Sequence, residues 1–142
     1  MNCSMGKCLI FLDTSVLVSY LVEGDSDHPR AEVSVNEIIS GKHGSAVTSD
    51  YVFDEMVIVV LVRSKSLDIA ATVGELIKES IAMIRIDERI FENSWMVCKK
   101  QKSTRLSFTD CTILTVVKEN HIDKIATFDK EFQSSDGYEV IR

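Results

Sequence analysis

The feature that most constrains this chain is a short apolar run over residues 8–12 that ends at the carboxylate of Asp13. An apolar run of this length, followed by helix-like periodicity, is typical of a buried parallel strand. Ligands of open α/β sheets bind beyond the carboxyl ends of such strands. Asp13 should therefore lie at the functional edge of a sheet, followed by the hydroxyls of Thr14 and Ser15.

The chain has 142 residues, of which 45% are apolar and 27% charged, so we expect one soluble globular domain over residues 1–142. Strand-like and helix-like segments alternate, which predicts an α/β fold. We expect a three-layer α/β/α sandwich with a central, mainly parallel sheet of Rossmann-like topology. Strands are predicted at residues 8–12, 45–48, 83–86, 124–128 and 138–141, and helices at 14–22, 29–40, 50–63, 66–81, 87–102 and 107–119.

The predicted helix 50–63 is apolar on almost every side. Its length and a cap at Ser49 or Asp50 favour a buried helix over a strand. Glu55 shares a face with apolar residues three and four positions away, so its side chain should point toward the core or a pocket. A buried carboxylate is costly unless it is paired or coordinated. Glu55 is therefore a functional candidate, with a salt bridge as the alternative, and Asp54 is expected in solvent.

Two further carboxylates occupy informative positions. Asp129 follows a predicted strand as Asp13 does, so both should lie at the same sheet edge. Asp110 follows Ser107 at the spacing of a capping box, but it also shares a helix face with apolar residues. Capping of a helix or turn is the alternative interpretation for Asp13, Asp110 and Asp129.

Together, the carboxylates of Asp13, Glu55, Asp110 and Asp129 predict one shared metal site. Oxygen ligands suit Mg²⁺ or Mn²⁺ better than zinc. Such an ion lowers the pKa of a bound water and stabilises charge on a phosphate, which suits hydrolysis of a phosphodiester. The formal net charge of −6 argues against simple neutralisation of phosphates, but a bound cation inverts the electrostatics of an acidic pocket.

Four segments resemble the signature segments of the PIN domain family, in the family's order and spacing. They are Phe11-Leu12-Asp13-Thr14-Ser15, Asp54-Glu55 in an apolar helix, Phe108-Thr109-Asp110-Cys111 and Thr127-Phe128-Asp129-Lys130-Glu131-Phe132. The resemblance implies a parallel sheet flanked by helices and a metal-dependent ribonuclease centre. Its acids would correspond to Asp13, Glu55, Asp110 and Asp129. The hydroxyls of Ser15 and Thr127 match supporting positions of the family.

The resemblance also implies a biological setting. Small members of the family resemble the toxin subunit of VapBC toxin–antitoxin pairs, which usually dimerise and are blocked by an antitoxin peptide. The implied reaction cuts RNA to leave a 5′-phosphate and a 3′-hydroxyl. We thus expect an RNA substrate, a small antitoxin partner and a homodimer. The alternatives are an RNA-processing nuclease outside a toxin–antitoxin system and a non-catalytic binding module with a PIN-like fold.

A basic run precedes the predicted helix that carries Asp110. It consists of Lys99, Lys100, Lys102 and Arg105. Such runs are usually solvated faces, and contact with RNA phosphates is the alternative. Arg63 and Lys65 form a second, smaller pair. The aromatic residues Phe91, Trp95 and Tyr20 are expected as core or dimer contacts more than as platforms for stacked bases.

The cysteines bear on metal binding and on the compartment. The chain contains Cys3, Cys8, Cys98 and Cys111, with no C-x-x-C pair, so a zinc site is not favoured. They are expected to be small buried hydrophobes in a reducing compartment. The N-terminus lacks the shape of a signal peptide, and no apolar stretch reaches membrane-spanning length. We therefore expect a cytoplasmic protein.

Two other families also place an aspartate after the first strand. A haloacid-dehalogenase-like phosphatase needs a second aspartate two residues later, where this chain has Ser15. A response-regulator receiver domain needs an acidic pair before the end of its first strand, and it has no place for a helical Glu55.

Overall fold

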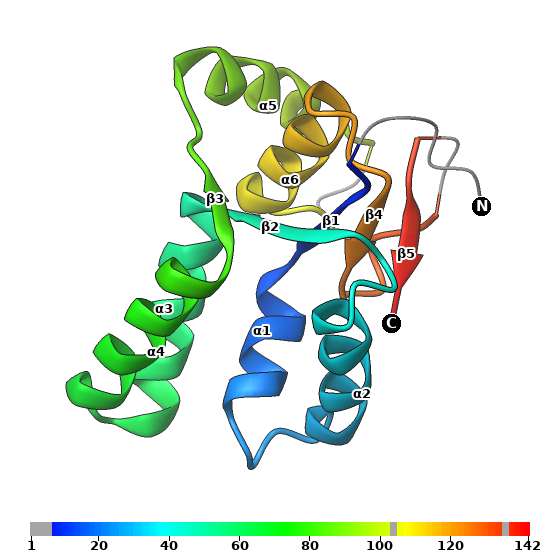
Figure 1. Cartoon of the computed structure of the whole chain (residues 1–142). Helices are drawn as coiled ribbons and strands as arrows, with labels where there is room; N and C mark the ends of the chain where they lie inside the picture. Colours follow the sequence, from blue (N-terminus) through cyan, green and yellow to red (C-terminus); the bar gives the residue numbers. More distant parts are fainter. Residues whose placement is uncertain (1–6, 103–104, 135–136) are drawn as a thin grey trace.

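The core of the fold is a sheet of five parallel strands (Figure 1). The computed structural model describes residues 7–102, 105–134 and 137–142. The strands lie in the order β3-β2-β1-β4-β5. Their bounds are β1 Leu9–Leu12, β2 Ser45–Ser49, β3 Ala82–Ile84, β4 Lys124–Ala126 and β5 Glu139–Ile141. This order is the Rossmann-like one and differs from the 2-1-3-4-5 order of receiver domains.

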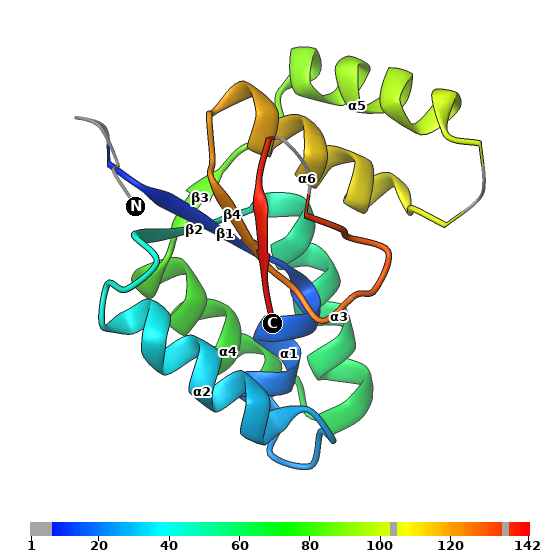
Figure 2. The same ribbon diagram turned by 90° about the vertical axis from the view of Figure 1, so that its right-hand side faces the viewer.

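Helices cover both faces of the sheet, which confirms the three-layer α/β/α architecture (Figures 1 and 2). Helices α1 to α4 lie on one side, and α5 packs with α6 on the other. The bounds are α1 Thr14–Leu21, α2 His28–Ile39, α3 Asp50–Ser64, α4 Leu67–Ser80, α5 Glu88–Lys100 and α6 Phe108–Glu119. Within the described ranges, none of these helices combines the length and the apolar character needed to cross a membrane.

The central strands are buried from both faces. Ile10 and Phe11 of β1 and Ile125 of β4 have no exposed surface. The apolar run of β1 is continuous because helices cover it above and below. The chain order reverses between β1 and β4, which makes their carboxyl ends the topological switch point of the sheet. Asp13 and Thr127 are the residues that follow these two strands.

Most helix starts predicted from capping residues are confirmed. The side chains of Ser49, Ser66, Asp87 and Ser107 each accept a hydrogen bond from the backbone N–H three residues later. These bonds satisfy amides that the first turn of a helix leaves without partners. These caps fix the residues at which α3 and α6 begin, and therefore the positions of Glu55 and Asp110 along the two helices.

Three predictions about elements need correction. Helix α3 is not a buried helix, because only one of its faces packs on the core and Val62 is 68% exposed on the other. Strand β3 ends before Ile86, whose N–H donates to the Asp50 carboxylate at 3.1 Å. Strand β4 ends at Ala126, because the Phe128 N–H turns away to bond the hydroxyl of Ser15.

The cysteines differ in state. Cys8 is disulfide-bonded, so the expectation of four reduced cysteines is wrong there. Cys98 is half-buried and Cys111 is buried, and both are free. Burial raises the pKa of the Cys111 thiol to about 12, which keeps it protonated and inert at neutral pH. Cys3 lies outside the described residues.

Candidate active site

Asp13 is buried at the end of β1, with 5% of its surface exposed. Its Oδ1 accepts the Thr14 N–H at 2.7 Å, so it caps α1 as the alternative interpretation predicts. Its Oδ2 accepts the hydroxyls of Ser15 at 2.9 Å and Thr127 at 2.7 Å. Burial raises the pKa of Asp13, and these hydrogen bonds oppose the rise by stabilising the carboxylate.

Ser15 and Thr127 connect the two sides of the switch point. Ser15 donates to Asp13 and accepts the Phe128 N–H at 2.9 Å. Thr127 donates to Asp13 and accepts the Asp129 N–H at 3.0 Å. The two hydroxyl oxygens lie 3.3 Å apart. Each hydroxyl therefore orients the Asp13 carboxylate and fixes the loop that follows β4.

Asp129 lies in that loop, two residues beyond Thr127. Its Oδ1 accepts the Glu131 N–H at 2.9 Å, which is the turn-capping role considered as its alternative. The Arg142 guanidinium holds the same loop by donating to the carbonyls of Thr127 at 3.1 Å, Asp129 at 3.2 Å and Phe132 at 2.7 Å. The sequence analysis missed Arg142, because no local pattern around it indicates a contact with the loop.

Asp110 closes the capping box predicted at the start of α6. Its Oδ2 accepts the Ser107 N–H at 2.9 Å, and its own N–H donates to the Ser107 hydroxyl at 3.1 Å. Capping leaves Oδ1 available for another role. Burial raises the pKa of Asp110, and the negative charges of Asp13 and Asp129 raise it further. Asp110 thus caps its helix and also faces the other acids.

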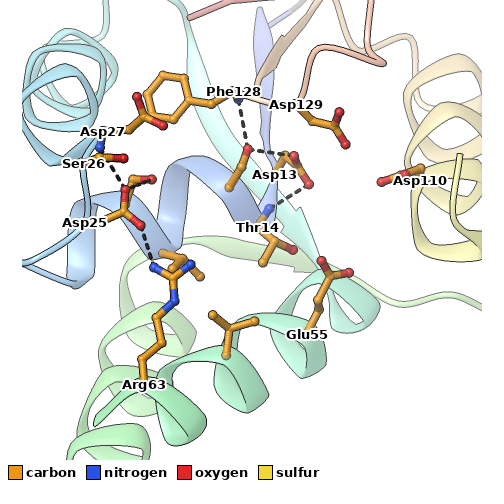
Figure 3. Close-up of a pocket in the computed structure, with 14 residues that line it drawn as sticks. Asp13, Thr14, Asp25, Ser26, Asp27, Glu55, Arg63, Asp110, Phe128 and Asp129 are labelled. Carbon is orange, nitrogen blue, oxygen red and sulfur yellow. Dashed lines mark hydrogen bonds and ion pairs between the residues drawn. The ribbon is translucent and has the colours of Figure 1, made fainter. Parts of the chain in front are cut away.

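Glu55 lies on α3, opposite Asp13 in the view of Figure 3. It is exposed rather than buried, but it lines the same pocket as the other acids. Partial burial raises the pKa of Glu55, followed by repulsion from Asp13 and Asp110. Asp54 is exposed and does not line the pocket, as predicted.

Thr14 is a site residue that the sequence analysis did not single out. Its hydroxyl is close enough to lower the pKa of Glu55, but it forms no hydrogen bond of ordinary geometry among the described residues. A buried hydroxyl without a partner is costly, and the polar group that the Thr14 hydroxyl influences is the Glu55 carboxylate. The signal was its position directly after Asp13, at the start of the first helix.

All four predicted acids line one pocket of about 480 Å³. Figure 3 shows Glu55, Asp110 and Asp129 turned toward the space in front of Asp13. Within the described residues, however, no three acidic, cysteine or histidine side chains stand close enough together to hold a metal ion as placed. Carboxylate oxygens suit a hard divalent cation, and water would have to supply its remaining ligands.

The basic run lies outside this pocket. Lys99, Lys100, Lys102 and Arg105 are exposed, and none of them lines it. The cation in the pocket wall is Arg63, which donates to Asp25 at 2.5 Å. The hydroxyl of Ser19 and the N–H of Asp27 also donate to Asp25. Sequence reasoning paired Arg63 with Lys65 and did not foresee its place beside the acids.

Comparison with known proteins decides the family. The model of the PIN domain family matches residues 10–137. The chain belongs to the PIN domain family. A curated relative, Ribonuclease VapC6 of Methanocaldococcus jannaschii, is 26% identical over 152 residues, covering 97% of this chain and 99% of the relative.

Solved structures agree on the PIN fold. VapC20 of Mycobacterium tuberculosis, described as a toxin that cleaves the sarcin-ricin loop, is similar with a TM-score of 0.75 and 21% identity, over 86% of this chain and 91% of that one. VapBC2 of Rickettsia felis, solved with a promoter DNA fragment, has a TM-score of 0.67 and 15% identity, over 94% and 97% of the two chains. A toxin–antitoxin complex from Klebsiella pneumoniae has a TM-score of 0.61 and 17% identity, over 94% and 96%.

Proposed function

We propose that this protein is a metal-dependent endoribonuclease that hydrolyses phosphodiester bonds in RNA. The observation that carries the proposal is one pocket in which burial and mutual repulsion raise the pKa values of Asp13, Glu55 and Asp110. Carboxylates gathered at such a cost to the fold are typical of a site that binds a cation. The name of the Methanocaldococcus relative, a ribonuclease, supports RNA as the substrate.

Asp13, Glu55, Asp110 and Asp129 would hold Mg²⁺ or Mn²⁺. When bound, the ion would lower the pKa of a water and neutralise charge on the phosphate. Ser15 and Thr127 keep the Asp13 carboxylate in one orientation through their hydrogen bonds. The Thr14 hydroxyl, which lowers the pKa of Glu55, would help to keep that carboxylate ionised. Arg63 would bind a phosphate of the strand at the pocket wall.

The proposal is tested with a labelled single-stranded RNA and the purified protein. Cleavage should require added Mn²⁺ or Mg²⁺, stop in EDTA and leave 5′-phosphate ends. Phosphomonoester hydrolysis, measured beside it, should be absent. Cleavage that persists in EDTA would contradict the metal-dependent assignment. A protein that binds the metal but never cuts RNA would favour the alternative of a non-catalytic binding module.

We further propose that the protein is the toxin of a toxin–antitoxin pair. An apolar groove of about 640 Å³ runs between α1, α2 and α4, lined in part by Leu17, Tyr20, Ile39 and Leu76. Its apolar lining suits the apolar face of an amphipathic helix. The Klebsiella neighbour is a toxin–antitoxin complex, which supports an antitoxin as the occupant. Failure to find any inhibitory partner would favour an RNA-processing nuclease.

Two exposed residues of α2 provide a matched test of this groove. Ile39 lines the groove, whereas Val33 is equally apolar and exposed but does not line it. With a small inhibitory protein encoded beside the nuclease, Ile39→Glu should prevent inhibition and Val33→Glu should leave it intact. Equal inhibition of both variants would show that the partner binds elsewhere.

A homodimer in the cytoplasm completes the proposal. Exposed apolar side chains on α3 and α4, among them Ile58, Val62 and Ile69, would be covered by a second copy. Sedimentation of the wild type should give twice the monomer mass, and Val62→Glu should shift it toward the monomer. A monomeric wild type at high concentration would contradict this part.

A further inference from the structure

Three aromatic rings form a continuous row on the face of α5 that meets the start of α6. The ring of Phe108 lies 5.0 Å from that of Phe91 and 6.3 Å from that of Trp95, both in edge-on contact. Phe91, Trp95 and Lys99 follow one another at intervals of four residues, so they share one side of α5. We call Phe91, Trp95 and Phe108 the aromatic row.

The aromatic row is not part of the core. Phe91 is 41% and Trp95 48% exposed, so of the two expected roles, core contact and dimer contact, the core one is wrong and the dimer one is not tested. The Lys99 ammonium lies 5.9 Å from the centre of the Trp95 ring, within reach of a cation–π contact. Exposed aromatic rings beside a cation are the parts from which platforms for stacked bases are built.

The aromatic row adjoins the helix that carries Asp110 of the acid pocket. Phe108 is the first residue of α6, two residues before Asp110. Its ring also contacts that of Tyr51 at 6.1 Å, and Tyr51 lies one helical turn before Glu55 on α3. Phe108 and Tyr51 therefore connect the exposed rings of α5 to the two helices that carry Asp110 and Glu55, although neither residue lines the pocket.

The C-terminal end of α5, beyond Trp95, is basic. Lys99 and Lys100 form the last turn of α5, and Lys102 and Arg105 follow it, all with exposed side chains. The acidic residues Glu88 and Glu92 lie in the first half of the helix. A polyanion laid along this side of α5 would thus meet the basic residues beyond Trp95. Because the pocket itself repels phosphates, such a strand needs binding energy from outside it.

We propose that the aromatic row is a docking site for single-stranded RNA, on which two unpaired bases stack on Phe91 and Trp95 while the basic end contacts their phosphates. The site rests on the proposed function, since it would hold the strand whose phosphodiester lies in the acid pocket. Stacking on aromatic side chains tolerates any base, so the row adds affinity and selects unpaired RNA over duplex.

The chain contains a single tryptophan, so its fluorescence reports on the row directly. The Asp13→Asn variant, or the wild type in EDTA should that variant not fold, is titrated with a short single-stranded RNA and with the same RNA annealed as a duplex. We expect saturable quenching of Trp95 by the single strand only. Inorganic phosphate should not reproduce the quenching.

Substitutions then measure what the row contributes. Trp95→Leu and Phe91→Leu should each weaken binding of labelled RNA, followed by anisotropy, by about tenfold, within the range for a stacked base. Met96→Leu is the matched control, because Met96 is exposed on the same helix outside the row. Lys99→Gln should weaken binding and reduce its dependence on salt.

Two results would overturn the proposal. One is that single-stranded RNA does not quench Trp95, or quenches it no more than duplex RNA does, and that Trp95→Leu binds RNA as tightly as the wild type. The other is a Trp95 signal that changes with protein concentration alone, which would assign the row to contact with a second copy or another protein. The proposed function can fail separately from the docking site. Quenching without metal-dependent cleavage would support the docking site and contradict the nuclease activity. Cleavage without quenching would support the nuclease activity and contradict the docking site.

Discussion

The Thr127 hydroxyl donates a 2.7 Å hydrogen bond to Oδ2 of Asp13, joining the ends of the two strands between which the sheet order reverses. Thr127 is fully buried and also accepts the Asp129 N–H. One side chain therefore holds two of the four acids in register with each other. The geometry of the pocket depends on this bond as much as on the carboxylates themselves.

Thr127→Val removes the hydroxyl while preserving the shape of the side chain. We predict a loss of about 1–3 kcal/mol in the free energy of unfolding, because Asp13 and the Asp129 N–H both lose a partner. The pKa of Asp13 should rise in this variant, because the hydrogen bond from Thr127 lowers it. The rise of the cleavage rate with pH on the acid side should therefore occur at higher pH. Denaturant titration and a pH–rate profile measure the two effects.

Thr115→Val is the control for that substitution. Thr115 is also buried, and its hydroxyl donates to the Cys111 carbonyl inside α6, away from the pocket. It should change stability but not the pH profile. Thr127→Ser should restore the profile. A Thr127→Val protein with an unchanged profile would show that Thr127 does not orient Asp13.

Glu55 and Asp54 are adjacent carboxylates on α3 with different predicted roles. Glu55→Gln should reduce cleavage by at least about a hundredfold, because it removes a proposed metal ligand. Asp54→Asn removes the same charge from the neighbouring position, which faces solvent, and should retain wild-type activity. Single-turnover cleavage rates at saturating Mn²⁺ compare them. Equal rates for the two variants would remove Glu55 from the site.

The raised pKa values also predict how stability depends on pH. For Asp13, Glu55 and Asp110 the folded-state pKa is above the ordinary value, so their contribution to stability is lost as pH rises through the raised values. In EDTA, Glu55→Gln should therefore melt higher than the wild type at about pH 7, and this advantage should shrink toward about pH 4.

Metal should reverse that order. Mn²⁺ neutralises the repulsion among the acids, so it should raise the Tm of the wild type more than that of Glu55→Gln, and more at neutral than at acidic pH. The pKa values of Asp25 and Glu37 are lowered, so these residues make stability increase with pH. They are present in both the wild type and Glu55→Gln, so their effect cancels in the Tm difference between the two proteins. A Tm difference independent of pH would contradict the proposed repulsion.

Arg63 is predicted to bind substrate. Arg63→Gln should raise the KM for RNA with a smaller effect on kcat, and the salt dependence of binding should fall by about 0.7 in slope, as for one lost phosphate contact with a single strand. Lys65→Asn removes a charge two residues away, outside the pocket, and Asn tolerates the left-handed backbone of that position. An unchanged KM for Arg63→Gln would leave Arg63 with only its structural bond to Asp25.

Local patterns in the sequence predicted the parts of the fold that local chemistry determines. The capping residues Ser49, Ser66 and Ser107 marked helix starts, and the apolar run before Asp13 marked the central strand. Strand ends were less accurate where a long-range bond intervened, as at Phe128, whose N–H reaches Ser15 across 113 positions of sequence. No local pattern encodes such a partner.

The same distinction applies to the candidate site. Asp13, Asp110 and Asp129 were found because each follows a strand or starts a helix, where a carboxylate has a local reason to lie. Arg63 and Arg142 were missed as site residues because their contacts depend on how distant elements pack. The core role expected for Phe91 and Trp95 was wrong, because helical periodicity indicates which residues share a face but not whether another element of the chain covers that face.

The central claim is that metal held by these acids cleaves RNA, and Asp13→Asn tests it most directly. Its cleavage of a labelled single-stranded RNA in Mn²⁺ is compared with that of the wild type and Asp54→Asn, after circular dichroism has shown that all three are folded. We predict cleavage by the wild type and by Asp54→Asn, and none by Asp13→Asn. Full cleavage by a folded Asp13→Asn protein would contradict the account.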